Sequence, residues 1–196
     1  MSDFQRICVY CASSPGRNPA ITAATVALGE LLVAEGIELV YGGASVGLMG
    51  LLADTVMAGG GRVIGVIPPK LLPREVAHTG LTQLIEVETM HQRKTKMFEL
   101  ADGFIALPGG FGTLEELAEV LTWAQLRIHG KPIGVLDVDG YYGSLLAFVR
   151  RGVDEGLLRP VNRAMLLDAV EPAALLAAMR AYEAPSGPMR LELGDT

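Results

Sequence analysis

The sequence GFIALPGGFGTLEE, residues 103–116, joins an apolar run to a helical pattern through a glycine-rich turn. The run at 103–107 has no polar alternation, which is typical of a parallel strand covered on both faces. Glycines let a ligand approach the backbone closely, and the start of the following helix directs free N–H groups at that ligand. The stretch therefore predicts a parallel α/β sheet with an anion site, most naturally for phosphate, after this strand.

The same strand-to-helix alternation extends outward along the whole 196-residue chain. We expect strands at 6–10, 38–41, 62–67, 84–87, 103–107 and 133–136, with a weaker pattern at 165–167. We expect helices near 18–35, 47–59, 89–101, 113–129, 141–155 and 172–183. This alternation requires right-handed crossovers and predicts an open α/β sheet with helices on both faces. A single domain would cover residues 1–183, with a long irregular connection at 68–83 and a flexible tail at 184–196.

Composition narrows the class of protein. The chain has 16 basic and 22 acidic residues, a net charge of −6, which argues against general binding to nucleic acid or anionic membranes. The longest uncharged stretch, Leu39 to Ala53, has fifteen residues and is too short to span a membrane. Two cysteines and a start that lacks signal-peptide features predict a cytoplasmic protein. Glycine is the unusual residue, with 24 in the chain.

The two cysteines form a C-x-x-C pair, Cys8 and Cys11, within and just after the first expected strand. Residues three apart on a strand point to opposite faces, so these side chains could not share a metal ion or a disulfide. No second cysteine pair exists to complete a zinc site. We therefore expect neither redox nor metal chemistry from this pair.

A second glycine loop, GGASVGLMG at 42–50, also follows an expected strand and enters a helix. Its spacing is that of a P-loop, but Leu48 and Met49 replace the required lysine and hydroxyl residue, and the chain has no G-x-G-x-x-G. ATP hydrolysis and ordinary dinucleotide binding are therefore disfavoured. Either loop could be only a tight turn; two of them in one short sheet favour anion sites at helix starts, and the ligand of the 42–50 loop stays open.

Thr113 and Glu116 have the T-x-x-E spacing of a helix capping box. In that interpretation both side chains satisfy backbone donors and take no part in chemistry. Glu115 is a second carboxylate in the same first turn, and either acid would suit the positive end of the helix dipole. The spacing alone leaves open which acid is free to act.

The helix expected at 89–101 also begins with a capping-box pattern, Thr89 with Gln92. Its apolar stripe consists of Met90, Met97, Phe98 and Ala101. Arg93 and Lys94 occupy positions on that stripe which should be apolar, so both cations would face the interior. Buried charge needs a partner, which predicts a phosphate or Glu116 opposite them. The alternative is a solvated basic face, if the helix is rotated by one residue.

These two segments together closely resemble the LOG ("lonely guy") family of cytokinin riboside 5′-monophosphate phosphoribohydrolases, often labelled lysine decarboxylases. The resemblance rests on MHQRK at 90–94 with PGGFGTLEE at 108–116. It extends over nearly the whole chain through CASS at 11–14, the 42–50 loop and PREV at 73–76. Ala12 replaces a glycine of many members, which should affect only loop shape.

The resemblance implies a Rossmann-like sheet, hydrolysis of the N-glycosidic bond of a purine ribonucleoside 5′-monophosphate such as N6-prenylated AMP, no cofactor, and a homodimer. It implies Arg93 and Glu116 as the catalytic pair. The implied nucleotide-binding residues are Glu75, Arg93, Lys94, Gly110, Phe111, Gly112, Thr113, Leu114, Glu115, Glu116 and Thr122. Thr113 would then serve the phosphate, and Glu116, one turn or about 5 Å further along, would stabilise an oxocarbenium-like sugar.

The residues present also argue for or against activities other than cytokinin release. Decarboxylation with pyridoxal phosphate needs a Schiff-base lysine, and none of the four lysines lies in a recognisable cofactor motif. These lysines are Lys70, Lys94, Lys96 and Lys131. Two alternatives remain beside the cytokinin enzyme: a general AMP nucleosidase, and a nucleotide-binding or carrier protein with little catalysis. The Arg93 and Glu116 pair favours an enzyme.

Overall fold

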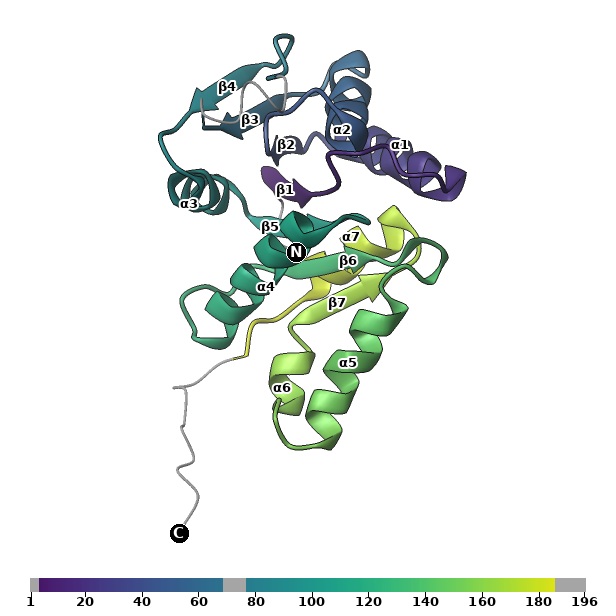
Figure 1. The fold of residues 1–196 in the computed structure, drawn as a ribbon, viewed down its shortest axis with the longest axis vertical. Helices are drawn as coiled ribbons and strands as arrows, with labels where there is room; N and C mark the ends of the chain where they lie inside the picture. Colours follow the sequence, from purple (N-terminus) through teal and green to yellow (C-terminus); the bar gives the residue numbers. More distant parts are fainter. Residues whose placement is uncertain (1–3, 69–76, 186–196) are drawn as a thin grey trace.

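The computed structural model describes residues 4–68 and 77–185, and within them the chain forms one seven-stranded parallel sheet (Figure 1). The strands are β1 (Arg6–Tyr10), β2 (Glu38–Tyr41), β3 (Val63–Ile67), β4 (Gln83–Glu86), β5 (Gly103–Ala106), β6 (Ile133–Leu136) and β7 (Leu166–Ala169). Their order across the sheet is β4-β3-β2-β1-β5-β6-β7. The predicted open, Rossmann-like α/β sheet is confirmed, and each predicted strand is present to within two residues.

Helices cover both faces of the sheet. They are α1 (Pro19–Ala34), α2 (Gly47–Ala58), α3 (Met90–Leu100), α4 (Phe111–Gln125), α5 (Gly143–Asp154), α6 (Pro160–Arg163) and α7 (Pro172–Ala181). Helices α1, α2 and α7 build one core with one strand face, and α3, α4 and α5 build the other. Strand residues alternate between these cores, because successive side chains point to opposite faces. Cys8 and Cys11 accordingly lie in different cores as buried free thiols, as predicted.

Four predicted helix boundaries need correction, one of them the end of α7, which lies at Ala181 rather than 183. Helix α4 begins at Phe111 rather than 113 and ends at Gln125 rather than 129, because Arg127 has a φ of 63°, which a right-handed helix cannot continue. The helix predicted from 141 begins at Gly143, after a short 3-10 turn at Val138–Gly140. Helix α6, one turn long, carried no periodic signal. Within the predicted 68–83 connection and the 184–196 tail, residues 69–76 and 186–196 lie outside the described residues.

The order of the strands places a crevice between β1 and β5. From β1 the chain winds outward through β2 and β3 to β4, then returns through α3 to β5 on the other side of β1. Tyr10 and Ala106, the last residues of these two strands, are paired neighbours. Ligands of open parallel sheets bind outside the carboxyl ends of the strands at such a reversal of strand order. The loops that follow β1 and β5 are therefore placed to form a site.

Candidate functional site

A cavity of about 330 Å³ opens at this crevice, and we call it the switch-point cavity. The loop after β1, the end of β2, helix α3 and the start of α4 all contribute to it. Its lining residues are Val9, Cys11, Ala12, Ser13, Ser14, Gly42, Met49, Met90, Arg93, Met97, Gly110, Phe111, Gly112, Thr113, Glu115 and Glu116. The carboxyl ends of three strands thus converge on one hollow that both predicted segments, 90–94 and 108–116, enter.

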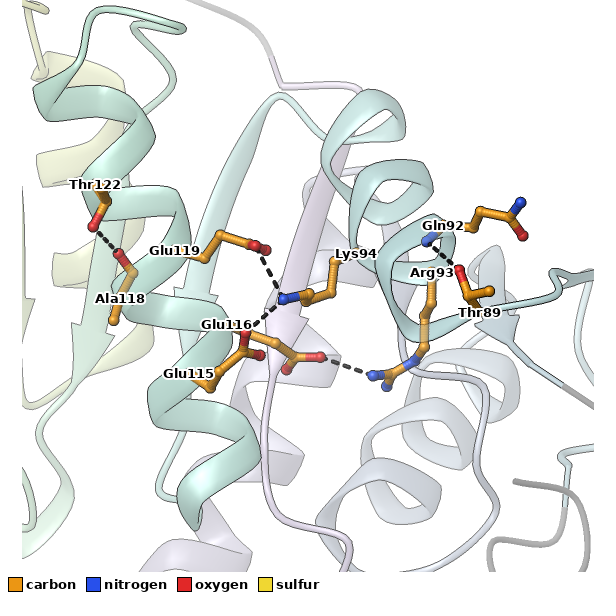
Figure 2. Close-up of polar contacts among 9 residues, drawn as sticks. All are labelled: Thr89, Gln92, Arg93, Lys94, Glu115, Glu116, Ala118, Glu119 and Thr122. Atoms are coloured by element: carbon orange, nitrogen blue, oxygen red, sulfur yellow. Dashed lines mark hydrogen bonds and ion pairs between the residues drawn. The ribbon is translucent and has the colours of Figure 1, made fainter. Parts of the chain in front are cut away.

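Arg93 and Glu116 form a buried ion pair in this cavity (Figure 2). The Nη1 atom of Arg93 lies 2.9 Å from Oε1 of Glu116, and the two side chains are only 8% and 10% exposed. The Nε–H of Arg93 also donates to the carbonyl oxygen of Val66 at the end of β3, 3.1 Å away. The prediction that Arg93 faces the interior and meets Glu116 is confirmed, and the solvated basic face is wrong for this residue.

Local sequence fixes where α3 starts and hence where Arg93 points. The Thr89 hydroxyl accepts from the N–H of Gln92, and the Gln92 side-chain oxygen accepts from the N–H of Glu88. The predicted cap at Thr89 is confirmed, with the return bond made one residue earlier than in a standard capping box. Helix α3 thus begins at Met90, which places Arg93 at the end of its first turn, facing the sheet.

The pKa of Glu116 is raised above its ordinary value. Burial is the main cause, and the negative charge of Glu115 adds to it, while Arg93 and, to a smaller extent, Lys94 act in the opposite direction. A carboxylate in a nearly dry site interacts strongly with charge that develops nearby, since little water screens it. Arg93 is the charge that favours the ionised form of Glu116 in this environment.

Lys94 makes a separate set of contacts with the other two acids of α4. Its Nζ lies 2.5 Å from Oε1 of Glu115 and 3.0 Å from Oε1 of Glu119 (Figure 2). Burial lowers the pKa of Lys94, but the hydrogen bonds to these two carboxylates outweigh it and raise the pKa. Lys94 is partly buried, with 11% of its side chain exposed, and it does not line the switch-point cavity. The two neighbouring acids near the start of α4 therefore pair with different cations, Glu115 with Lys94 and Glu116 with Arg93.

The start of α4 presents bare backbone to the cavity. The helix begins at Phe111 and is capped at Gly110 without any side-chain bond, so the capping-box interpretation of Thr113 and Glu116, one of the alternatives left open by the spacing, does not apply. Within the described chain, the N–H groups of Phe111, Gly112 and Thr113 have no hydrogen-bond acceptor. A Cβ atom at Gly110 or Gly112 would meet nothing within 4 Å. This helix start has the donors and the space that an anion requires.

The 42–50 loop is different, and the anion site expected there is wrong. The N–H groups of Leu48 and Met49 both point to the carbonyl oxygen of Ala12, so the start of α2 is already occupied. At Gly42 a Cβ atom would lie 1.9 Å from Nη2 of Arg93. At Gly47, where φ is +60°, it would lie 2.3 Å from the backbone of Ser13. These glycines make room for Arg93 and for the loop after β1.

The remaining predicted site residues lie at or beyond the edge of the cavity. Thr122 is exposed, donates its hydroxyl hydrogen to the carbonyl oxygen of Ala118, and points away from the ion pair (Figure 2). Leu114 lines a neighbouring groove instead, and Phe111 is 92% exposed at the mouth. Glu75 lies outside the described residues.

Nine lining residues were not among the predicted site residues: Val9, Cys11, Ala12, Ser13, Ser14, Gly42, Met49, Met90 and Met97. The available signal was topological, because the strand order alone places the ends of β1 and β5 together.

Residues 4–68 and 77–185 contain few groups that suit other chemistry. No three His, Cys, Asp or Glu side chains gather there as a metal site would require, and none of the helices described could cross a membrane. Lys131 donates to the carbonyl oxygen of Phe98 and lies 4.2 Å from the centre of its ring, away from the cavity. Lys96 pairs with Glu99. Lys70 lies outside the described residues.

A parallel sheet with a site at its switch point defines the class of Rossmann-like α/β proteins. The family described as "Possible lysine decarboxylase" matches residues 49–179. The chain is 53% identical to a probable cytokinin riboside 5′-monophosphate phosphoribohydrolase, LOGL5, from Oryza sativa subsp. japonica, over 94% of this chain and 75% of that protein. It is 52% identical to LOG7 of Arabidopsis thaliana, over 93% and 84%. The chain belongs to this LOG family.

Solved structures share the fold at lower identity. A molybdenum cofactor carrier protein from Chlamydomonas reinhardtii matches with a TM-score of 0.65 and 21% identity, over 90% of this chain and 96% of that one. A molybdenum cofactor binding protein from Rippkaea orientalis matches with a TM-score of 0.64 and 20% identity, over 90% and 94%. At this identity the likeness concerns the fold alone.

Proposed function

We propose that this chain hydrolyses the N-glycosidic bond of purine ribonucleoside 5′-monophosphates, with N6-prenylated AMP as the substrate, and so releases a free cytokinin base and ribose 5-phosphate. The observation that carries the proposal is the buried pair of Arg93 and Glu116, one helical turn beyond the open start of α4. Relatives about half identical over most of the chain are named as enzymes of this activity.

The phosphate would bind at the start of α4. The unpaired N–H groups of Phe111, Gly112 and Thr113 converge there, and the helix dipole adds positive potential. The sugar would then lie about one helical turn further in, beside Glu116. This placement assigns the 5′-phosphate a binding role and leaves the carboxylate for the anomeric carbon.

At that carbon, the bond to the purine nitrogen breaks and its electron pair stays with the base. The sugar becomes oxocarbenium-like, and the ionised Glu116 stabilises this positive charge. A water oxygen then bonds to the anomeric carbon, and the water's proton is passed to the departing purine. Arg93 keeps Glu116 ionised against the effect of burial and holds it toward the cavity.

Four apolar side chains in the lining of the cavity, which we call its apolar wall, support binding of an apolar base: Val9, Met49, Met90 and Met97. Methionine adapts its shape to flat rings and branched chains. A general AMP nucleosidase would use the same pair of charges but would gain less from this wall. The preference for a prenylated base over plain AMP is therefore a proposal about the wall, separate from the proposal about bond cleavage.

We also propose that the protein acts as a homodimer in the cytoplasm. The dimer is supported by three exposed apolar side chains that line one groove beside the cavity: Phe111 (92%), Leu114 (42%) and Tyr141 (48%). Such a patch in a water-soluble protein usually marks an interface. The buried free thiols suit a reducing compartment. Light scattering and cell fractionation test the two statements.

The decisive experiment incubates the purified protein separately with isopentenyl-AMP, AMP and isopentenyladenosine, and quantifies released base by chromatography. We expect fastest release from isopentenyl-AMP and very slow release from the nucleoside without phosphate. Equal release from AMP would identify a general nucleosidase. Binding of the monophosphates without any release would leave the carrier and overturn the enzyme.

A further inference from the structure

Two consecutive tyrosines lie behind the glycine turn that begins α4. The hydroxyl of Tyr142 donates to the carbonyl oxygen of Leu107, and that of Tyr141 donates to the carbonyl oxygen of Gly109, both at 2.6 Å. These carbonyl groups belong to the two residues that flank Pro108 in the chain. Neither tyrosine lines the switch-point cavity. Both line a second groove, of about 340 Å³, on the opposite side of the turn.

The two bonds have different consequences for the backbone. The peptide that follows Leu107 leads into Pro108, which has no N–H, so Tyr142 fixes only the end of β5. The peptide that follows Gly109 carries the N–H of Gly110. Since this peptide is trans, its N–H points opposite to the carbonyl group that Tyr141 holds.

The lining residues of the two hollows indicate that this direction is toward the cavity. Gly109 lines only the groove, whereas Gly110 lines both the groove and the switch-point cavity, so the peptide between them forms part of the partition. The carbonyl oxygen is turned to the groove side, and the N–H is turned to the cavity side. Among the described residues this N–H has no acceptor, like the three that follow it in α4.

We propose that Tyr141 is a positioning residue for phosphate binding: its hydroxyl holds the Gly109–Gly110 peptide so that the N–H of Gly110 joins those of α4 around the 5′-phosphate. The inference rests on the proposed function, because it takes the phosphate site from it. Glycine makes the peptide easy to rotate, and a fixed external bond removes that freedom. The phosphate then meets donors that are already oriented.

Other contacts of the turn that carries Tyr141, residues 137–142, restrict the movement of this side chain. The ring of Tyr142 is buried and meets that of Tyr141 edge-on, with 5.3 Å between the ring centres. The N–H of Tyr142 donates to Asp137, and Asn18 of the α1 cap donates to Asp139, which has a φ of 53°. The turn that follows β6 is thus held by two further hydrogen bonds besides the one from Tyr141 to Gly109.

The variant Tyr141→Phe tests the proposal, because it keeps the ring and removes only the hydroxyl. Calorimetric titration with ribose 5-phosphate should give a dissociation constant about three- to tenfold larger than that of the parent, the loss expected for one oriented hydrogen bond. The dissociation constant for adenine, which carries no phosphate, should stay within about twofold. Tyr182→Phe, at the end of α7, removes a hydroxyl far from the turn and should change neither value.

Each other result overturns the proposal. Unchanged affinity for ribose 5-phosphate would mean that the hydroxyl does not orient the donors. An equal loss for adenine would mean that Tyr141 supports the cavity in general. No binding of ribose 5-phosphate to the parent would remove the phosphate site itself. Failure of the proposed function appears separately, as absence of base release from isopentenyl-AMP by the parent protein.

Discussion

The two glycine loops of this protein look alike in sequence but differ in what their glycines do. In the 42–50 loop, neighbouring atoms occupy the space where a Cβ atom would lie. The side chain of Arg93 occupies it at Gly42, and the backbone of Ser13 occupies it at Gly47. In the 108–116 loop the space at Gly110 and Gly112 is open to the cavity. At the start of α2, N–H groups donate to the carbonyl oxygen of Ala12, whereas those at the start of α4 have no acceptor among the described residues.

This difference separates two tasks that one site requires. The first loop positions Arg93, the cation of the proposed catalytic pair, and the second carries the N–H groups proposed to bind the phosphate, followed by Glu116. A glycine beside a functional site can therefore protect a protein side chain or leave room for a ligand, and only the packing distinguishes the two. Variants at equivalent places in the two loops should accordingly fail in different ways.

The largest effect should come from Glu116→Gln, which removes the charge and keeps the shape. Without that charge the cationic sugar loses its stabilising partner, and we expect kcat to fall about a thousandfold, with little change in the affinity for ribose 5-phosphate. The measurement is base release from isopentenyl-AMP under saturating conditions. Glu119→Gln, three residues further along α4 and bonded to Lys94 instead of Arg93, is the matched control and should lose little. Full turnover by Glu116→Gln would mean that another carboxylate acts.

Gly42→Ala should break the first loop's task while the fold survives. The new methyl group would overlap the ends of two flexible side chains, Arg93 and Met49, which can move without disturbing the backbone. Arg93 would leave its place beside Glu116, and a displacement of about 1 Å at a catalytic group can cost about a hundredfold in kcat. Steady-state kinetics and a melting curve measure the two effects. An unchanged kcat would show that the position of Arg93 is not critical.

Gly110→Ala should affect the second loop's task instead. Gly110 has ordinary negative φ, and its Cβ atom would meet nothing, so the fold should survive; the poorer capping by alanine should lower stability by about 1 kcal/mol at most. The methyl group would enter the space where the phosphate is proposed to bind, and we expect KM to rise about three- to tenfold with kcat nearly constant. If Gly42→Ala raised KM alone and Gly110→Ala lowered kcat alone, the assignment of tasks to the two loops would be reversed.

Most of the fold could be predicted from the sequence. Continuous apolar runs between helical patterns predict buried parallel strands, and every one of those strands formed. The boundaries of α4 were wrong because Thr113 and Glu116 imitate a cap, while the true cap, Gly110, uses no side chain. Backbone capping of this kind leaves a weaker signal than T-x-x-E. The end of α4 depends on the unusual φ of Arg127, which no residue-type preference predicts.

The part of the site that could be predicted is the one where charged residues occupy positions on an apolar helix face. Arg93 and Lys94 on an apolar stripe required acidic partners, and the structure supplies them. The distribution of those partners was not predictable, since it depends on which carboxylate each side chain reaches across the gap between α3 and α4. Tyr141 was not predictable either. It acts through a carbonyl group 32 residues earlier in the chain, and such a contact has no local sequence signal.

The smallest expected effect concerns pH and distinguishes the neighbours of Glu116. Catalysis requires the ionised carboxylate, so activity should fall as pH drops through the pKa of Glu116, which burial raises. The negative charge of Glu115 raises this pKa further; Glu115→Gln should therefore move the acid limb of kcat/KM to lower pH, by less than about one unit. Lys94→Gln removes a charge that lowers the pKa, so the limb should move to higher pH.

Gly42→Ala provides the third arm of this measurement and returns to the first loop. Its methyl group displaces Arg93, whose charge is the strongest influence that lowers the pKa of Glu116. The acid limb should therefore move to higher pH by more than in Lys94→Gln, whereas Gly110→Ala should leave it in place. A limb that stayed fixed in Gly42→Ala despite a reduced kcat would mean that Arg93 acts on the substrate directly, and that the first loop positions a substrate ligand rather than the partner of Glu116.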